Sequence, residues 1–491
     1  MKRLIGIFTG IAVMLGAIVS IQALAYVVGG LAENLFSGAS RLTNIIFLML
    51  VFVMIMATLL TMAERKWSAL MQNRIGPNRA KLVVGPINNS LMGLPHILTD
   101  SLKMLTKERF RPEGANKFLF NLGPILAFAP VFALFAVVPV GPSVKWDGHV
   151  VDMVVATPDF GMLYLLGIAS LAVYGTALAG WASNNKFALL GGVRASSQMI
   201  SYEVALGLSL VGLMVAFSTV QLPAFVGNMA NEGAGVATGQ ARFLWAANAN
   251  VGLPAWGIFL QPLGFILFFA ASFAETKRAP FDSPEGESEI IGYFVEYSGM
   301  QFGLFMISEF VEVVVLSGVL TVLFFGGWHL PIYGEALAAS SFMQEHGWIY
   351  GTILGTVFWL KVLLLIWLQL TIRWTFPRFR YDQIMTLGWK ILLPAGLVNL
   401  FLSAALVLWD PSLRALAVMG LLEIGFVIAL TLTKRETAGA HGGGHGHGAH
   451  GDHGHGALDH GHGGHAIAAH GATAHAAHAD DHAHAAPAAS H

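Results

Sequence analysis

Apolar runs of about 20 residues, separated by shorter polar stretches, recur along the chain as far as residue 432. A run of this length forms a helix long enough to cross the ~30 Å hydrocarbon core of a bilayer. Ten such spans are predicted, at residues 4–29, 43–63, 118–140, 162–181, 200–219, 256–274, 297–325, 350–372, 389–409 and 413–432. The pattern therefore predicts an all-α polytopic membrane protein.

The first of these runs has two interpretations. Lys2 and Arg3, an apolar stretch and the small residues around Ala23 and Ala25 have the layout of a cleaved signal peptide. The apolar stretch is about 21 residues long, which is more than the core of a signal peptide needs. We therefore favour an uncleaved helix.

A second kind of periodicity occurs in the polar connection after the second span, between residues 64 and 117. One helical face there is apolar and carries Leu94, Ile97, Leu98, Leu102 and Leu105. This spacing predicts an amphipathic helix that lies on the membrane surface. The alternative is an ordinary surface helix of a small cytoplasmic domain.

Composition excludes the main soluble classes. Apolar residues make up 55% of the 491 residues and charged residues only 11%, whereas soluble proteins carry roughly 25% charged residues. A soluble enzyme of this composition would lack a polar shell. The net charge of −1 leaves no basic surface for DNA or RNA, so we expect no nucleic-acid partner.

Lysine and arginine predict the orientation. If the spans alternate, 22 of the 27 basic residues fall on one side. Only Arg41, Lys145, Arg242 and Arg414 fall on the other, and Lys361 lies within a span. Because basic loops stay in the cytoplasm, we expect the basic side and the C-terminus to be cytoplasmic.

Cysteine is absent, which excludes disulfides and thiolate-held iron–sulfur clusters. Fifteen of the 19 histidines lie between residues 441 and 491, and the other four are not central in any span. We expect no haem, no iron–sulfur cluster and no dedicated metal site in this chain. Any electrons must then be carried by another chain.

The last residues, 437–491, are rich in Gly, Ala and His. Such a low-complexity segment cannot bury apolar surface, and it is predicted to be a disordered tail. Either it is solvated and has no partner, or its imidazoles bind divalent metal ions weakly at many sites.

Ionisable residues within or beside the spans are the candidates for chemistry, because each costs roughly 2.5–3.5 kcal/mol at a helix centre. The pattern places Glu203 at the start of the fifth span and Glu296 at the start of the seventh. Glu309 and Glu312 lie inside the seventh and share one face. Together they exceed what packing requires, although a lone carboxyl such as Glu423 is better explained as a neutral or paired group between helices.

The loop between the sixth and seventh spans is the most acidic part of the chain. Ser283 is predicted as an N-cap, with Pro284 at the first helical position. Glu285, Glu289 and Glu296 would then fall on one helical face. A row of carboxylates entering a membrane can hold protons and suits proton transfer. The alternative is a solvated acidic loop.

Four blocks of sequence on the predicted cytoplasmic side carry a specific resemblance. They are AERK at residues 63–66 with NRIGPN at 73–78, SNNKFALLGGVR at 183–194 continuing to Glu203, RAPFD at 278–282 with EGESE at 285–289 and VEYSG at 295–299, and RWTFPRFRYDQ at 373–383. Together they resemble the quinone-chamber membrane subunit of proton-pumping NADH:quinone oxidoreductase, respiratory complex I.

The resemblance covers residues 43–410 and implies eight spanning helices. It divides the chain into an extra N-terminal helix or anchor (1–42), the quinone-chamber membrane domain (43–410), an extra C-terminal helix (411–436) and the tail (437–491). Lys277 and Phe294 depart from the residues usual in the family.

The resemblance also implies a function. The chain would form the quinone cavity together with peripheral-arm subunits that carry the terminal iron–sulfur cluster. It would contact other complex I membrane subunits and lipid in a bacterial inner membrane. Quinone would be a substrate, with no covalently bound cofactor. The carboxylates implied to couple quinone reduction to proton translocation are Glu203, Asp282, Glu285, Glu287, Glu289, Glu296 and Glu309. The residues implied to contact quinone or line its cavity are Arg65, Arg194, Arg278 and Phe281.

Two other functions are weighed. Membrane-bound nickel–iron hydrogenases and coenzyme F420 dehydrogenases use a related subunit, but the complete acidic loop favours the quinone enzyme. An ion-coupled secondary transporter would show internal repeats and paired broken helices, and no repeat is evident in this sequence.

Overall fold

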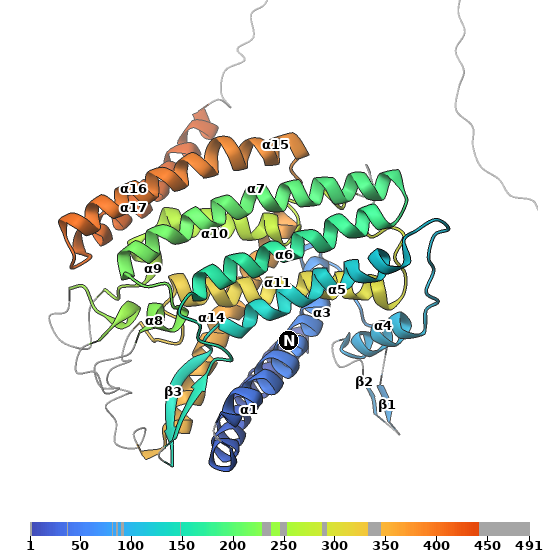
Figure 1. The fold of residues 1–491 in the computed structure, drawn as a ribbon, viewed down its shortest axis with the longest axis horizontal. Helices are drawn as coiled ribbons and strands as arrows, with labels where there is room; N and C mark the ends of the chain where they lie inside the picture. The colour runs from blue at the N-terminus through green and yellow to red at the C-terminus, as the bar shows by residue number, and fades with distance from the viewer. Residues whose placement is uncertain are drawn as a thin grey trace, which may run out of the picture. The chain divides into compact units, whose positions relative to one another are not determined.

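The computed structural model describes residues 2–36, 38–80, 82–84, 87–89, 93–147, 149–227, 237–245, 253–286, 292–331 and 345–440. Within these ranges, nine helices are long and apolar enough to cross a membrane (Figure 1). The predicted all-helical polytopic fold is confirmed. Residues up to Leu432 form one compact unit. Residues 441–491, most of the predicted tail, lie outside the described residues.

The long helices follow the predicted spans closely. They are α1 (Lys2–Leu35), α3 (Met54–Met71) continuing from α2 (Ala39–Asn44) and η1 (Ile45–Val53), α5 (Lys117–Leu134) extended by η3 (Phe135–Val137), α6 (Gly161–Ala182), α7 (Lys186–Phe217), α11 (Met300–Phe324), α14 (Gly347–Thr375), α16 (Leu393–Trp409) continuing from α15 (Tyr381–Thr386) and η6 (Leu387–Leu392), and α17 (Arg414–Ala440). The short helices in the connections are α4 (Pro95–Thr106), α8 (Leu222–Val226), η5 (Gly239–Ala241), α9 (Gly257–Leu260) and α10 (Pro262–Glu275).

The sixth predicted span is divided into two helices. α9 ends at Leu260, the backbone of Gln261 leaves the helical region, and α10 restarts at Pro262, whose missing N–H suits a helix start. At 14 residues, α10 is about 21 Å long, so one continuous span here was a wrong prediction. The break is tolerated because Gln261 is fully buried and donates to Ser403 Oγ at 2.7 Å.

α11 is the centre of the bundle. It packs against α3, α5 and α14, and 94% of its most apolar stretch is buried by protein. α5, α6 and α7 pack in sequence beside it (Figure 1). Carboxyls on α11 therefore face other helices rather than lipid.

The N-terminal helix α1 is tied to α14 through polar contacts. Trp359 Nε1 donates to Gln22 Oε1 at 3.2 Å, and Tyr26 Oη donates to the carbonyl of Pro142 at 2.9 Å. Gly351 and Gly355, one turn apart on α14, leave the space that the Tyr26 and Gln22 side chains fill. Small residues at this spacing allow close helix packing in membranes.

Two hairpins lie in the connections, and neither was predicted. β3 (Gly141–Trp146) pairs with β4 (His149–Met153), and β1 (Leu82–Val84) pairs with β2 (Ile87–Asn89), both antiparallel. In the first hairpin Val144, Val151 and Met153 are buried, and β3 packs on α14 while β4 packs on α1. These strands are too short for their alternation to stand out among long apolar runs.

The amphipathic helix is confirmed as α4. Leu98, Leu102 and Leu105 of its apolar face are 59–65% exposed. An apolar helical face left open on a polytopic protein suits contact with the membrane interface.

The contact between α1 and α14 gives a first prediction. In Gly355→Leu the new side chain would occupy the place of the Gln22 amide, and such overpacking costs about 1–3 kcal/mol. We expect a lower melting temperature of the detergent-purified complex. Gly16→Leu on α1 is the control, because no atom lies near its added Cβ. Equal melting temperatures for both variants would show that the two helices do not pack as described.

Candidate functional site

The four sequence blocks meet at one end of the bundle, here called the loop end. Arg278 of the third block pairs with Glu64 of the first, and Arg378 of the fourth pairs with Asp282 of the third. Asn185 of the second block donates to Glu296 at 2.6 Å. Arg278 and Glu64, which are 214 residues apart in sequence, thus belong to one polar region.

Glu64 lies at the centre of these contacts. Its Oε2 accepts from Arg278 Nη1 at 2.7 Å, and its Oε1 pairs with Arg373 Nη1 at 2.8 Å. The Arg278 guanidinium also stacks on the Phe310 ring, 4.0 Å from its centroid. One carboxylate therefore joins α3, the loop after α10 and the end of α14, and its partners satisfy both oxygens.

Asp282 is a second buried carboxyl with a guanidinium partner, and that partner, Arg378, is 43% exposed. Its Oδ2 accepts from Arg378 Nη2 at 2.6 Å, while its Oδ1 is buried with no hydrogen-bond partner among the described residues. Burial raises the pKa of Asp282 to about 6, against the opposing charge of Arg378. This carboxyl can therefore change protonation near neutral pH.

Glu285 and Glu309 form a carboxyl pair beside it. Burial, followed by the charge of Glu309, raises the pKa of Glu285 well above its ordinary value, and the two carboxyls lie within hydrogen-bonding reach. Tyr293 Oη donates to Glu309 Oε1 at 3.5 Å. Two carboxylates this close repel each other, which adds to the effect of burial on Glu285.

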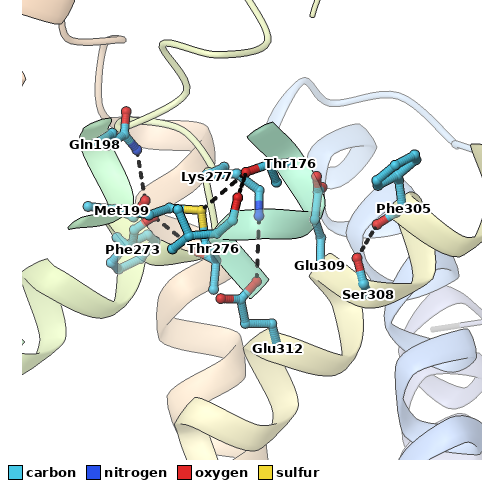
Figure 2. A network of polar contacts seen from close by, with 12 residues as sticks. Thr176, Gln198, Met199, Phe273, Thr276, Lys277, Phe305, Ser308, Glu309 and Glu312 are labelled. Atoms are coloured by element: carbon cyan, nitrogen blue, oxygen red, sulfur yellow. Dashed lines mark hydrogen bonds and ion pairs between the residues drawn. The ribbon is translucent and has the colours of Figure 1, made fainter. Parts of the chain in front are cut away.

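A third cluster lies deeper, around Glu312 (Figure 2). The ammonium of Lys277 points toward the Glu312 carboxylate, with Nζ 3.9 Å from Oε2. Glu275, at the end of α10, is also buried, and its Oε2 has no hydrogen-bond partner among the described residues. All three residues are less than 5% exposed.

Glu203 was wrongly placed by the sequence pattern. The helix that carries it begins at Lys186, well before the predicted span, so Glu203 lies in the middle of α7 and not at a span start. Lys186, Arg194 and the polar residues 196–198 interrupt the first half of this helix, and for this reason the apolar run was predicted to begin later. Glu203 is half-buried, and its charge acts on Glu275.

The predicted helix from Ser283 to Glu296 is also wrong where it is described. Residues 284–285 and 293–296 form turns, and Gly292 has a φ of +135°, outside the helical region. Glu285 and Glu296 therefore do not share a helical face. Glu287 and Glu289 lie outside the described residues. A solvated loop does not describe residues 276–283, because nearly all of them are buried.

A cavity of about 160 Å³ opens between α3, α4 and α11. It is lined by Thr58, Thr61, Glu64, Arg65, Ile97, Asp100, Ser101, Met104, Met306, Ile307 and Phe310. Its wall is apolar over most of its area and ends at the Glu64 carboxylate. The cavity is therefore continuous with the buried charges through Glu64 and Phe310.

The four expected quinone-contact residues divide into two groups. Arg65 lines the cavity and pairs with Asp100 at 2.5 Å, and Arg278 reaches the cavity wall through Glu64 and Phe310. Arg194 instead faces the Tyr381 ring, and Phe281 packs between Tyr202 and Phe379. The structure does not bring these last two residues to the described cavity.

Sequence reasoning missed three buried charged groups, Glu64, Glu275 and Lys277, and the half-buried Arg373. Each flanks an apolar run, where a charge normally reaches water, so its position alone predicted exposure. A signal was available for Glu64, which directly precedes Arg65 and Lys66 in the first block.

Fold and site together define a polytopic membrane protein with a buried network of carboxylates and cations beneath one end. Comparison with known proteins identifies its family. The NADH dehydrogenase family matches residues 43–404. An H subunit of NADH-quinone oxidoreductase from Cytophaga hutchinsonii is 41% identical over 357 residues, 72% of this chain and 93% of the relative. An H subunit of the same enzyme from Geobacter metallireducens is 41% identical over 352 residues, 72% of this chain and 92% of the relative.

The chain belongs to the H-subunit family of NADH-quinone oxidoreductase. It is thus a multi-pass membrane subunit of complex I, which it forms with other subunits. The family match covers neither α1 nor α17.

The shared contacts of Glu64 give a second prediction. In Glu64→Gln, Arg278 and Arg373 lose their common counter-charge, and breaking a buried pair costs about 3–5 kcal/mol. We expect much less assembled complex on native gels of membranes. Asp382→Asn is the matched control, because the exposed Arg380–Asp382 pair contributes about 0–1 kcal/mol. Normal assembly of Glu64→Gln would contradict this role for Glu64.

Proposed function

We propose that this chain forms the membrane part of the quinone cavity and couples quinone reduction to proton translocation. The observation that carries the proposal is the continuity between the cavity and the buried charges. Glu64 is at once a wall of the cavity and the partner of Arg278, so a change at the cavity alters the electrostatic environment of the carboxylates.

The cavity suits the passage of an isoprenoid tail. Ile97, Met104, Met306 and Ile307 supply an apolar wall between a surface helix and two spans. An opening at this level lets a lipid-soluble molecule leave the bilayer without crossing water. Arg65, Asp100 and Glu64 lie where a polar headgroup would need hydrogen bonds.

The carboxylates support a proton path toward the interior of the bundle. Asp282 and Glu285 lie at the loop end, and both have a raised pKa caused first by burial. Glu309 follows on α11, and Glu312 lies one turn further along the same helix. Groups that share protons at short spacing can pass a charge change along the row.

Electron transfer belongs to other chains in this proposal. The chain has no cysteine, so it holds no thiolate-ligated cluster. Peripheral-arm subunits with the terminal iron–sulfur cluster would dock on the loop end. The excess of Lys and Arg in the loops of this end supports a cytoplasmic location for it in a bacterial inner membrane.

The test is replacement of Glu203, Glu285 and Glu309 by glutamine, one at a time. Glutamine keeps the shape of the side chain but cannot ionise. We expect quinone reduction and proton translocation in membranes to fall together by about tenfold or more per assembled complex. Oxidation of NADH by a hydrophilic artificial acceptor should be unchanged, because that reaction takes place in the peripheral arm.

A packing role for these carboxyls makes the opposite prediction. It requires less assembled complex with normal activity per complex. Values close to wild type in all three variants, normalised to assembled complex, would refute the proton-coupling function. Glu113→Gln is the control, because this exposed glutamate lies outside the buried network.

The cavity generates a separate prediction. In Ser101→Trp an indole would fill part of the 160 Å³ space from α4. We expect the KM for a long-tailed quinone to rise about tenfold, which corresponds to a loss of ~1.4 kcal/mol. Thr99→Trp, on the same helix but not in the cavity wall, is the control. Identical KM values for the two variants would place the quinone path elsewhere.

A further inference from the structure

The cations of the loop end are unevenly shared among the buried carboxylates. Glu64 takes Arg278 and Arg373, and Asp282 takes Arg378. Within the described part of the chain, Lys277 is then the cation left for the deeper carboxyls. Those carboxyls are Glu275, Glu309 and Glu312.

Lys277 reaches this position through an unusual backbone conformation. It follows the end of α10 with a φ of +54°, in the left-handed region, and its N–H donates to the carbonyl of Ala274. Glycine or asparagine normally occupies this position of a helix end, because a larger side chain is strained there. The conformation turns the Lys277 side chain back into the bundle, so that the ammonium lies 3.9 Å from Glu312 (Figure 2).

The burial of Lys277 also needs an explanation. It is 4% exposed although it lies at a helix end, where a lysine normally extends to water. A buried ammonium is costly unless a carboxylate pairs with it. Strain together with burial of a charge is typical of a functional position rather than of packing.

We infer that Lys277 is a positioning residue for proton coupling. Its ammonium holds the Glu312 carboxylate in place and supplies the counter-charge that Glu275 and Glu309 share. This inference rests on the function proposed above. With three carboxyls and one ammonium, the cluster is most stable when protons occupy part of the carboxyls. Lys277 thereby sets how many protons the cluster holds.

The charged groups that face this pair come from several elements. They are Glu203 on α7, Glu275 on α10, Arg278 in the loop after α10 and Glu309 on α11, with Glu64 on α3 and Arg373 on α14 acting through Arg278. Glu285 reaches the cluster through Glu309. Among the described residues, Lys277 is the one positive charge near this cluster that is not already paired with Glu64 or Asp282. Its removal therefore leaves the carboxyls of the cluster without an unshared cation.

The experiment is the pH dependence of quinone reduction by the whole complex in membranes. In Lys277→Met the cation that competes with protons for the carboxylates is lost, so the acidic limb of the profile should move to higher pH by about one unit. Glu312→Gln removes a negative charge and should move the limb to lower pH. The double variant should lie close to wild type, since it removes one charge of each sign.

Two further variants make the result decisive. Lys277→Arg keeps the charge and should keep the wild-type profile, and with Glu312→Gln it tests the inference even where Lys277→Met fails to assemble. Lys117→Met is the exposed control. A purely structural Lys277 would change the amount of complex and leave the profile in place, and unmoved profiles in both single variants would overturn the inference.

Glu309→Gln is measured alongside to separate the two proposals. If it keeps full proton translocation, the proposed coupling function fails, whatever Lys277 does. If it loses translocation while Lys277→Met and Glu312→Gln keep the wild-type profile, only the role of Lys277 fails.

Discussion

Glu64 is held between two guanidinium groups, and the arrangement of the loop end depends on this contact. It joins three separate segments: α3, the loop after α10 and the end of α14. A carboxylate inside a membrane protein is tolerated only when cations and hydrogen bonds replace water. Because Glu64 meets this condition, Arg278 is directed inward and the following residues, Phe281 to Ser283, remain buried behind it.

The same constraint explains why the carboxyls form separate groups. Asp282 pairs with Arg378, the Glu285 carboxyl lies beside Glu309, and Glu312 pairs with Lys277. The cost of burial is therefore met differently in each group, because a salt bridge stabilises the ionised carboxylate whereas a neighbouring carboxylate favours the protonated form. A row of groups that differ in this way can respond to a charge change at one end, which is what the coupling proposed above requires.

The N-terminal helix α1, which lies outside the family match, is held in place by polar contacts. α1 contacts α14 and the β3–β4 hairpin, and it does so through Gln22 and Tyr26 as well as by apolar contact. Since lipid competes equally well for apolar side chains, hydrogen bonds and close glycine contacts give a membrane helix its specific place.

The sequence by itself determined the membrane class, nearly all of the spans and the four blocks of the site. The length and apolarity of a span are local properties of the sequence, and they must match the thickness of the bilayer. It could not determine which carboxyl meets which cation. Glu64 and Arg278 are 214 residues apart, and only the packing of α3 against α11 and α14 brings them together. The tertiary structure also decided that Glu203 is in mid-helix, that Gly292, between Glu285 and Glu296, has a non-helical φ, and that Lys277 turns inward. These three features depend on backbone geometry or on a residue distant in sequence. Local periodicity of the sequence contains no information about backbone geometry or distant partners.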